Sequence, residues 1–435
     1  MRNQCLSLRL RHAVAALAGC ALCLAAPHSA EGDGLGPNSL AEAIAIAREG
    51  NPDIRAAQAS YRSMRERPSQ LGTLPDPMLS VRYHNEKFSE LTFDESDFSF
   101  VEIAAEQEVP FPGKLSLRRE IAEREADRER AMRDMTVLMV LSGVATSWAE
   151  LEVADRSEAI LRESARALAL IRDQTAARYS VGDATQQDVL RAGLEIGAIE
   201  ERRVLVERSR AASAAKLNAW LGREAAFAIP RISASEPFAA LEDVEELRRR
   251  LADFSPAIRA ARLEVLRGDA ALRLARREYL PNFALMGGYM NKGSLYPEWE
   301  LGVRVEIPLY YWRKQRAGVA EASFAKSSAK HARRSAELSL EGRVTELHAM
   351  GEAAARLLRL YGETLIPRAS ATFESALASY DVGRVDFLTT VSAFTSLLEY
   401  RMRQVEEAGN LAIARAELAP LVGETPLGEA LEEAP

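Results

Sequence analysis

Cysteine and histidine most often bind metal ions or serve as nucleophile and base, and this chain of 435 residues contains few of them. All three cysteines lie close to the N-terminus: Cys5, Cys20 and Cys23. Three histidines lie beyond residue 30, and no two have the spacing of a helical zinc motif: His84, His331 and His348. No glycine-rich phosphate loop or nucleophile elbow is present. We therefore expect no enzyme, no catalytic residue, no cofactor and no resident metal ion.

The first 30 residues have the features of a secretory signal peptide. An apolar run from Ala13 to Ala26 follows several arginines and ends in small residues before Glu31. A transmembrane anchor is the rival interpretation, but the run is shorter than the roughly 20 residues that a spanning helix needs. We therefore expect residues 1–30 to be removed on export.

The run also contains Leu17-Ala18-Gly19-Cys20, which resembles a lipoprotein cleavage box that would leave Cys20 acylated. Small residues are common in the apolar segment of any signal peptide, and here the run continues beyond Cys20. Both outcomes stay open. Conventional cleavage would leave the exported chain without a thiol for disulfides, metal ligation or catalysis.

Overall composition favours long solvated helices in an acidic protein. The chain has 63 acidic and 56 basic residues. The charged residues among residues 1–30 are all basic, so their loss would make the exported protein more acidic. Nucleic acid is therefore not an expected partner. Aromatic residues make up only 6% and charged residues 27%. Few breakers punctuate the chain, with 18 prolines and 25 glycines. This profile is typical of long helices rather than of a compact sandwich.

The chain repeats itself after roughly 200 residues. Pro52-Asp53-Ile54-Arg55-Ala56-Ala57 returns as Pro256-Ala257-Ile258-Arg259-Ala260-Ala261. Glu108-Val109-Pro110 returns as Glu306-Ile307-Pro308, and Val181-Gly182 returns as Val382-Gly383. We expect a tandem duplication, with a first repeat at residues 31–236 and a second at residues 237–435.

The Ala-rich periodicity of residues 40–71 predicts one helix at the start of the first repeat. Each repeat is then expected to contain two strands. Period-two alternation predicts strands near residues 77–85 and 98–109 in the first repeat, and near 282–290 and 298–308 in the second. In the last strand five apolar side chains alternate with polar or small ones: Trp299, Leu301, Val303, Val305 and Ile307. An isolated strand of this kind would normally belong to a soluble sheet with one wet face.

Two long helices follow the strands of each repeat. They are expected near residues 113–179 and 184–220, and near 311–380 and 385–419, with a kink at Pro367. At about 1.5 Å per residue the first would reach roughly 100 Å. Such polar helices cannot cover an apolar sheet, and four strands cannot close a barrel in lipid without free edges. Several copies must therefore pool their strands, with the Trp299 to Ile307 face toward lipid.

The order of these landmarks resembles the TolC-like outer-membrane factor family over essentially the whole exported chain. The match rests on duplicated halves, Pro-bounded strand pairs and two tip turns, Tyr179-Ser180-Val181-Gly182 and Tyr380-Asp381-Val382-Gly383. Two segments further resemble the heavy-metal efflux branch (CzcC/CusC-like): Pro110-Phe111-Pro112-Gly113-Lys114 and Gly383-Arg384-Val385-Asp386-Phe387-Leu388. The resemblance implies a mainly α fold with a β-barrel part, in which a trimer forms one 12-stranded outer-membrane barrel continued by a periplasmic helical barrel.

The resemblance also implies partners and roles. It implies a homotrimer in the outer membrane that contacts outer-membrane lipid, a periplasmic adaptor (membrane fusion) protein and an inner-membrane pump of RND type. The tip turns that would contact the adaptor are Val181, Gly182, Val382 and Gly383. The candidates for a closed gate are Asp188, Tyr380, Asp183 and Asp386, with Asp381 as a further carboxylate. Two positions where some relatives carry pore-lining carboxylates hold Thr389 and Ser392 here.

The resemblance thus implies an outer-membrane channel subunit of a tripartite efflux system, with heavy-metal cations as the expected cargo. Organic toxicants and type I protein secretion are alternative cargoes. From another class, a periplasmic coiled-coil scaffold would also have long charged helices, but it would not need the alternating strands.

Overall fold

The computed structural model describes residues 36–86, 88–94, 96–232 and 241–430. Cys20 and the expected signal peptide lie outside the described residues. The described elements of the first half are α1 (Leu40–Gly50), α2 (Pro52–Gly72), β1 (Met78–His84), β2 (Phe100–Val109), α3 (Lys114–Ser180) and α4 (Gln186–Trp220). Those of the second half are α5 (Val244–Phe254), α6 (Pro256–Arg277), β3 (Asn282–Asn291), β4 (Glu298–Glu306), α7 (Lys314–Leu360), η1 (Tyr361–Leu365), α8 (Ile366–Asp381) and α9 (Phe387–Leu421). Each half runs two helices, two strands and then long helices.

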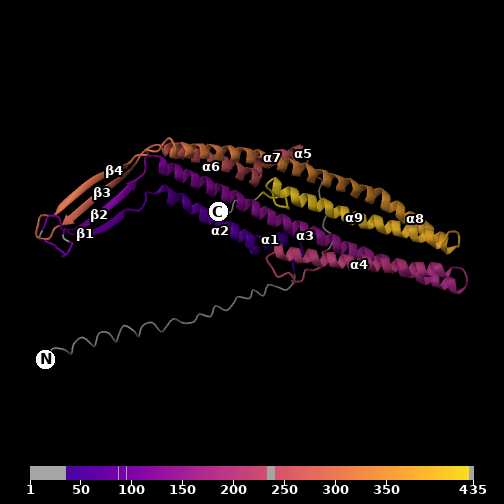
Figure 1. Ribbon diagram of the computed structural model, residues 1–435. Coiled ribbons are helices and arrows are strands. Elements are labelled where there is room, and N and C mark those ends of the chain that lie inside the picture. Colours follow the sequence, from indigo (N-terminus) through magenta and orange to yellow (C-terminus); the bar gives the residue numbers. More distant parts are fainter. Residues whose placement is uncertain (1–35, 87, 95, 233–240, 431–435) are drawn as a thin grey trace, which may run out of the picture.

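The elements are arranged along one long axis. Figure 1 shows the four strands at one end and the α3–α4 and α8–α9 turns at the opposite end. The helix α3 alone has 67 residues, which at 1.5 Å per residue gives about 100 Å. The molecule therefore separates its strand end from its helical tips by most of its length.

Proline and asparagine set where the short helices begin. The periodicity of residues 40–71 predicts one helix, but the structure breaks it at Asn51. The Asn51 side chain accepts from the backbone N–H groups of Asp53 and Ile54, and Pro52 occupies the first helical position, where no N–H is needed. In the second half α6 also begins with a proline, Pro256 after Ser255, but the Ser255 side chain makes no cap hydrogen bond. A cap inside the helical pattern therefore divides it into α1 and α2.

The sheet has the order β1-β2-β3-β4, with every neighbouring pair antiparallel. The register places Val81 opposite Ile103, Ile103 opposite Tyr289 and Tyr289 opposite Trp299, so one face carries a continuous apolar row. The opposite face carries the charged side chains, including the Arg82–Glu102 ion pair at 3.3 Å. β1 and β4 are the two edges of this sheet.

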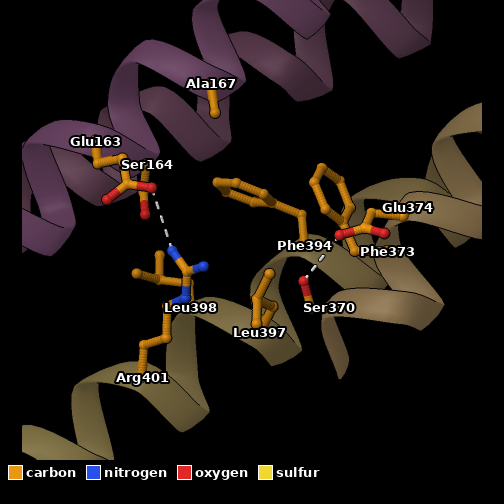
Figure 2. A pocket seen from close by; sticks show the side chains of 10 residues that line it. All are labelled: Glu163, Ser164, Ala167, Ser370, Phe373, Glu374, Phe394, Leu397, Leu398 and Arg401. Atoms are coloured by element: carbon orange, nitrogen blue, oxygen red, sulfur yellow. Dashed lines mark hydrogen bonds and ion pairs between the residues drawn. The ribbon is translucent and has the colours of Figure 1, made fainter. Parts of the chain in front are cut away.

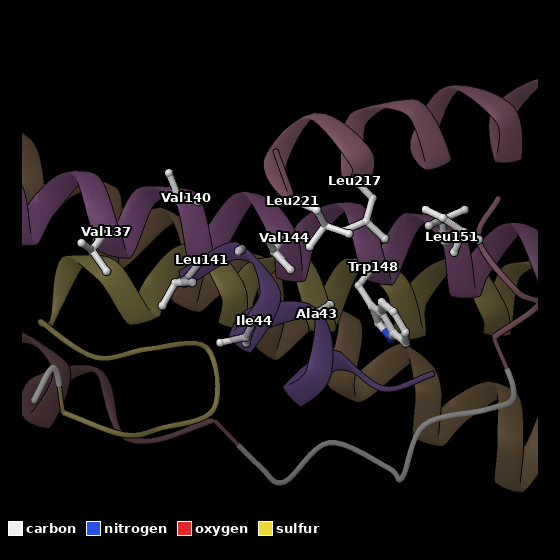
Figure 3. Close-up of a cluster of buried hydrophobic side chains, with 12 residues drawn as sticks. Ala43, Ile44, Val137, Val140, Leu141, Val144, Trp148, Leu151, Leu217 and Leu221 are labelled. Atoms are coloured by element: carbon white, nitrogen blue, oxygen red, sulfur yellow. The ribbon is translucent and has the colours of Figure 1, made fainter. Parts of the chain in front are cut away.

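The main core lies midway along the helices. Figure 3 shows Ala43 and Ile44 of α1, Trp148 of α3, Leu217 of α4 and Leu221 directly after α4 packed together. By length and composition, α3 is the one helix among the described residues that could cross a membrane, but 67% of its most apolar window is buried in the protein. Its apolar stripe therefore belongs to the core of the helical bundle.

One turn of π-helix separates α7 from α8. The backbone N–H of Ile366 donates to the carbonyl of Tyr361, five residues earlier rather than four. Pro367 follows directly; it has no N–H for the carbonyl of Glu363, and its ring would crowd that carbonyl in a regular helix. The expected kink at Pro367 thus takes the form of a widened turn.

Candidate functional site

Both helical tips end in the same glycine turn. In the first, Gly182 has φ of 88° and the N–H of Asp183 donates to the carbonyl of Arg178 at 2.9 Å. In the second, Gly383 has φ of 72° and the N–H of Arg384 donates to the carbonyl of Ser379 at 2.9 Å. This bond from the residue after the glycine is the Schellman pattern, which satisfies carbonyls at a helix end.

The tip turns present apolar side chains to the outside. Val181 is 72% exposed and Val382 is 66% exposed. A Cβ added at Gly182 would meet nothing within 4 Å, and one added at Gly383 would meet only the Arg178 guanidinium at 3.8 Å. Both glycines are therefore required by their backbone angle, and the space in front of them is open.

The four gate candidates are not gathered into one shared network within the chain. Asp188 forms a capping box at the start of α4, where its carboxylate accepts from the backbone N–H and the hydroxyl of Thr185. Tyr380 is buried, and its hydroxyl donates to Thr175 Oγ1 at 3.2 Å. Asp183 is exposed on the first turn. The structure thus places Asp188 and Tyr380 in different local networks.

Asp386 caps α9 in a comparable way. Its carboxylate accepts from the backbone N–H of Thr389 at 2.9 Å and also from the hydroxyl of that residue. The Thr389 hydroxyl and backbone hydrogen bonds hold the pKa of Asp386 below its usual value. Asp386 is exposed and stays charged at neutral pH.

Three residues that the sequence did not single out connect the two tips. Arg178 donates from Nη1 to the carbonyl of Tyr380, and its guanidinium lies 4.7 Å from the centre of the Tyr380 ring. Gln174 Nε2 donates to Asp381 Oδ1 at 2.6 Å, and Thr175 accepts from Tyr380 as described above. The only sequence signal for Arg178 was a basic residue in the last turn of α3, which is common at helix ends.

A small pocket of about 200 Å³ lies above the tips, between α3 and the α8–α9 pair. Figure 2 shows Arg401 reaching Glu163 across the gap, with the rings of Phe373 and Phe394 beside it. The Arg401 to Glu163 contact is 3.4 Å, and Ser370 donates to Glu374 at 3.1 Å. This ion pair and several apolar side chains line the pocket, and its lining residues include no nucleophile paired with a base.

The sheet brings the predicted apolar side chains of the last strand onto one face. All five are exposed in the single chain: Trp299, Leu301, Val303, Val305 and Ile307. The opposite face carries two arginines, Arg82 and Arg304. It also carries six glutamates: Glu102, Glu106, Glu108, Glu298, Glu300 and Glu306. Arg304 pairs with Glu106, so the charged face is partly neutralised and remains acidic.

Among the described residues, no group of three or more His, Cys, Asp or Glu side chains is placed to hold a metal ion. The geometry described so far is that of a long helical bundle joined to an amphipathic sheet. The model of the outer membrane efflux protein family matches residues 43–223 and 247–424, one segment in each half. The chain belongs to the outer membrane efflux protein family.

Known relatives of this efflux protein agree with that assignment. The outer membrane protein TolC of Vibrio cholerae serotype O1 is 24% identical over 378 residues, covering 83% of this chain and 85% of TolC. The efflux protein is therefore an outer-membrane transport protein and not an enzyme. This assignment also removes the soluble periplasmic scaffold as an alternative.

Solved structures show the same fold. A structure of CusC superposes with a TM-score of 0.76 at 16% identity, covering 89% of this chain and 92% of CusC. The outer membrane protein VceC of Vibrio cholerae gives a TM-score of 0.74 at 17% identity, covering 88% of this chain and 96% of VceC. The outer-membrane channel OprN gives 0.73 at 16% identity, covering 88% and 89%. These matches confirm the expected fold class; at such identity they support the fold alone.

Proposed function

We propose that this efflux protein is the outer-membrane duct of a tripartite efflux system. Three copies form one channel that receives cargo from a periplasmic adaptor and an inner-membrane pump of RND type. The observation that carries the proposal is the four-stranded sheet, which has two free edges, one exposed apolar face and one acidic face.

Free strand edges decide the oligomeric state. The outer edges of β1 and β4 lack a neighbouring strand in the described chain, so their backbone groups would face lipid unpaired. Each unpaired backbone group in a hydrocarbon layer costs several kcal/mol. If β4 of one copy pairs with β1 of the next, three copies close a barrel of twelve strands and no edge remains.

Strand length and aromatic side chains support a position across the membrane. β3 has 10 residues and β4 has 9, which matches the roughly 9–11 residues of a tilted strand that crosses a bilayer. Exposed aromatic side chains lie beyond both ends of β4, at Tyr296 on one side and at Trp312 on the other. Aromatic residues at two levels are typical of the two membrane interfaces.

The helical tips suit a contact with the adaptor. They lie at the far end from the strands (Figure 1), and the exposed turn residues Val181, Gly182, Val382 and Gly383 offer an apolar surface with open space in front. Behind them, Arg178 and Tyr380 join α3 to α8. We place the resting gate in this network, with Asp183, Asp188 and Asp386 available for links to neighbouring copies.

Heavy-metal cations are the cargo that we propose. The acidic face of the sheet would line the barrel, and carboxylates concentrate cations in a pore while binding them weakly enough for transit. The segments Pro110 to Lys114 and Gly383 to Leu388, which resemble the heavy-metal branch, give independent support.

Deletion of the gene followed by a growth panel tests the cargo. Strains would be grown with salts of Zn, Co, Cd, Ni, Cu and Ag beside organic toxicants, and complemented with the wild-type gene. We expect sensitivity to one or more metal salts, restored by the gene. Sensitivity confined to organic compounds, or loss of a secreted protein, would assign a different cargo to the same duct.

A further inference from the structure

A cluster of exposed aromatic rings lies where β4 leads into α7. We call the four residues the junction aromatics: Tyr279, Tyr310, Tyr311 and Trp312. The ring of Tyr311 lies 5.2 Å from that of Trp312 and 6.5 Å from that of Tyr279, which follows the end of α6. All four side chains are exposed in the chain. The cluster therefore continues the apolar face of β4 beyond the end of the strand.

Three cationic side chains follow the aromatic rings directly. We call Arg313, Lys314 and Arg316 the junction cations. All three are exposed, and no ion pair of theirs is found among the described residues. The neighbouring carboxylate of Glu278 is already engaged by Lys114 at 3.0 Å and Arg118 at 3.8 Å.

The equivalent junction of the first half uses its cation differently. Lys114 follows Phe111-Pro112-Gly113 and is buried, and its amine donates to Glu278, to the carbonyl of Leu280 and to Asn282. That cation holds α3, α6 and β3 together. The junction cations have no comparable task in the fold, so their charge is available to an external partner.

We propose that the junction cations bind the phosphate groups of anionic phospholipids in the periplasmic leaflet of the outer membrane, with the junction aromatics seated at the same interface. The inference rests on the proposed function, because it requires the apolar face of β4 to lie in lipid. Aromatic rings prefer the headgroup level, and cations just beyond it attract anionic headgroups. The patch would fix the depth of the duct in the membrane.

A second copy of the chain is the rival occupant, since α7 and α2 lie on opposite sides of the bundle and would become neighbours in a closed ring. Charge argues against it. The last turns of α2 carry Arg62, Arg65 and Arg67, with Glu66 as the one carboxylate of α2 there, and Arg67 is paired with Glu125 of α3 at 3.2 Å. Arg62 and Arg65 outweigh Glu66, so that surface is net positive and repels the junction cations. Anionic phospholipid is complementary to them.

The test compares lipid binding to the full-length protein in detergent by native mass spectrometry. The probes are phosphatidylglycerol and phosphatidylethanolamine with identical acyl chains. The variant is the triple substitution Arg313→Gln, Lys314→Gln and Arg316→Gln. The matched control is Lys330→Gln, Arg333→Gln and Arg334→Gln, which removes the same charge from α7 at roughly 24 Å from the junction.

We expect the wild type and the control to bind phosphatidylglycerol in preference to phosphatidylethanolamine. In the junction variant the ratio of the two bound lipids should fall at least fivefold, since one interfacial cation accounts for about that factor. Glycerol 3-phosphate should not displace the lipid. An equal preference in all three proteins, or full displacement by glycerol 3-phosphate, would overturn the proposal. So would dissociation of the junction variant into monomers, which would assign the patch to a subunit interface.

The same spectra report the oligomer, so the two proposals fail differently. A wild-type protein that stays monomeric would contradict the proposed duct. A wild-type trimer without preference for phosphatidylglycerol would contradict the lipid site alone.

Discussion

At the scale of single residues, backbone angle and local hydrogen bonds decide most roles at the tips. The pair Gly182 and Gly383 could be found from the sequence because the duplication repeats Val-Gly, and the structure shows the positive φ that requires glycine. The role of Asp188 as a capping residue is also readable from Thr185 three positions earlier. The contact between Arg178 and Tyr380 was not readable, because it joins residues 202 positions apart through packing.

A bulky side chain at Gly383 should block the adaptor. Both Gly383→Trp and Gly383→Ala carry the cost of positive φ, about 1 kcal/mol, but only Trp extends into the open space before the turn. We expect Gly383→Trp to reduce resistance to the level of the deletion strain while Gly383→Ala retains most of it. The measurement is growth on the exported toxicant, with membrane abundance checked by immunoblot. Full resistance of the Trp variant at normal abundance would remove this turn from the docking surface.

Removing the Arg178 side chain should loosen the resting tip. Arg178→Ala loses the hydrogen bond to the Tyr380 carbonyl and the contact with its ring, so we expect a severalfold rise in single-channel conductance in planar bilayers. Arg172→Ala is the control, because the one ion pair of Arg172 among the described residues is with the adjacent, exposed Asp173. Asp188→Asn retains a capping side chain and removes its charge, so it tests a link to another copy separately. Conductance of Arg178→Ala equal to that of the control would place the gate elsewhere.

A buried carboxylate on α3 predicts the direction of one pH effect. Burial alone would raise the pKa of Glu158, but hydrogen bonds from Arg162 and Arg203 lower it below the usual glutamate value. A lowered folded pKa means that the stabilisation is present above the unfolded pKa and is lost as pH falls through the folded pKa. We expect the midpoint of thermal unfolding to fall in acid more steeply for wild type than for Glu158→Gln. Parallel curves for the two proteins would contradict this assignment.

At the scale of elements, periodicity and proline positions are enough to predict whether most segments are helices or strands. They do not predict how these segments pack against one another. Alternation along residues 298–308 predicted a strand, and β4 is the result. The break at Asn51 was missed because the Ala-rich pattern continues through it, although Pro52 was a visible signal. The π turn before Pro367 could not be predicted, since either a bent α-helix or a widened turn satisfies the same proline.

The crossing of α3 and α9 depends on the small size of Gly409. A Cβ at this position would lie 2.3 Å from Val153 Cγ2, closer than atoms can approach. We expect Gly409→Ala to destabilise the protein by about 1–3 kcal/mol, as overpacking usually does. Gly193→Ala on α4 is the control, because nothing lies within 4 Å of its added Cβ and alanine favours the helix.

The measurement is denaturant unfolding followed by circular dichroism. The double variant Gly409→Ala with Val153→Ala should recover part of the lost stability, because it shortens the side chain that the new Cβ meets. A Gly409→Ala protein as stable as the Gly193→Ala control would show that the two helices adjust without cost.

At the scale of the whole molecule, the internal repeat and the amphipathic strands made the architecture predictable, because a chain with polar helices and four lipid-type strands has few stable arrangements. The structure adds the register, which gathers apolar side chains on one face and six glutamates on the other. The sequence could not supply the contacts between tips, since they depend on how two hairpins a half-chain apart lie together.

The central claim is that three copies share one barrel, and the molar mass of the purified full-length protein in detergent tests it most directly. Multi-angle light scattering, with the detergent contribution subtracted, gives the mass of the protein alone. One chain has a mass of 47.8 kDa before any processing. The account predicts three times the mass of the mature chain, stable on dilution. A monodisperse monomer that stays folded in the same detergent would contradict it, because the edges of β1 and β4 would then need no partner.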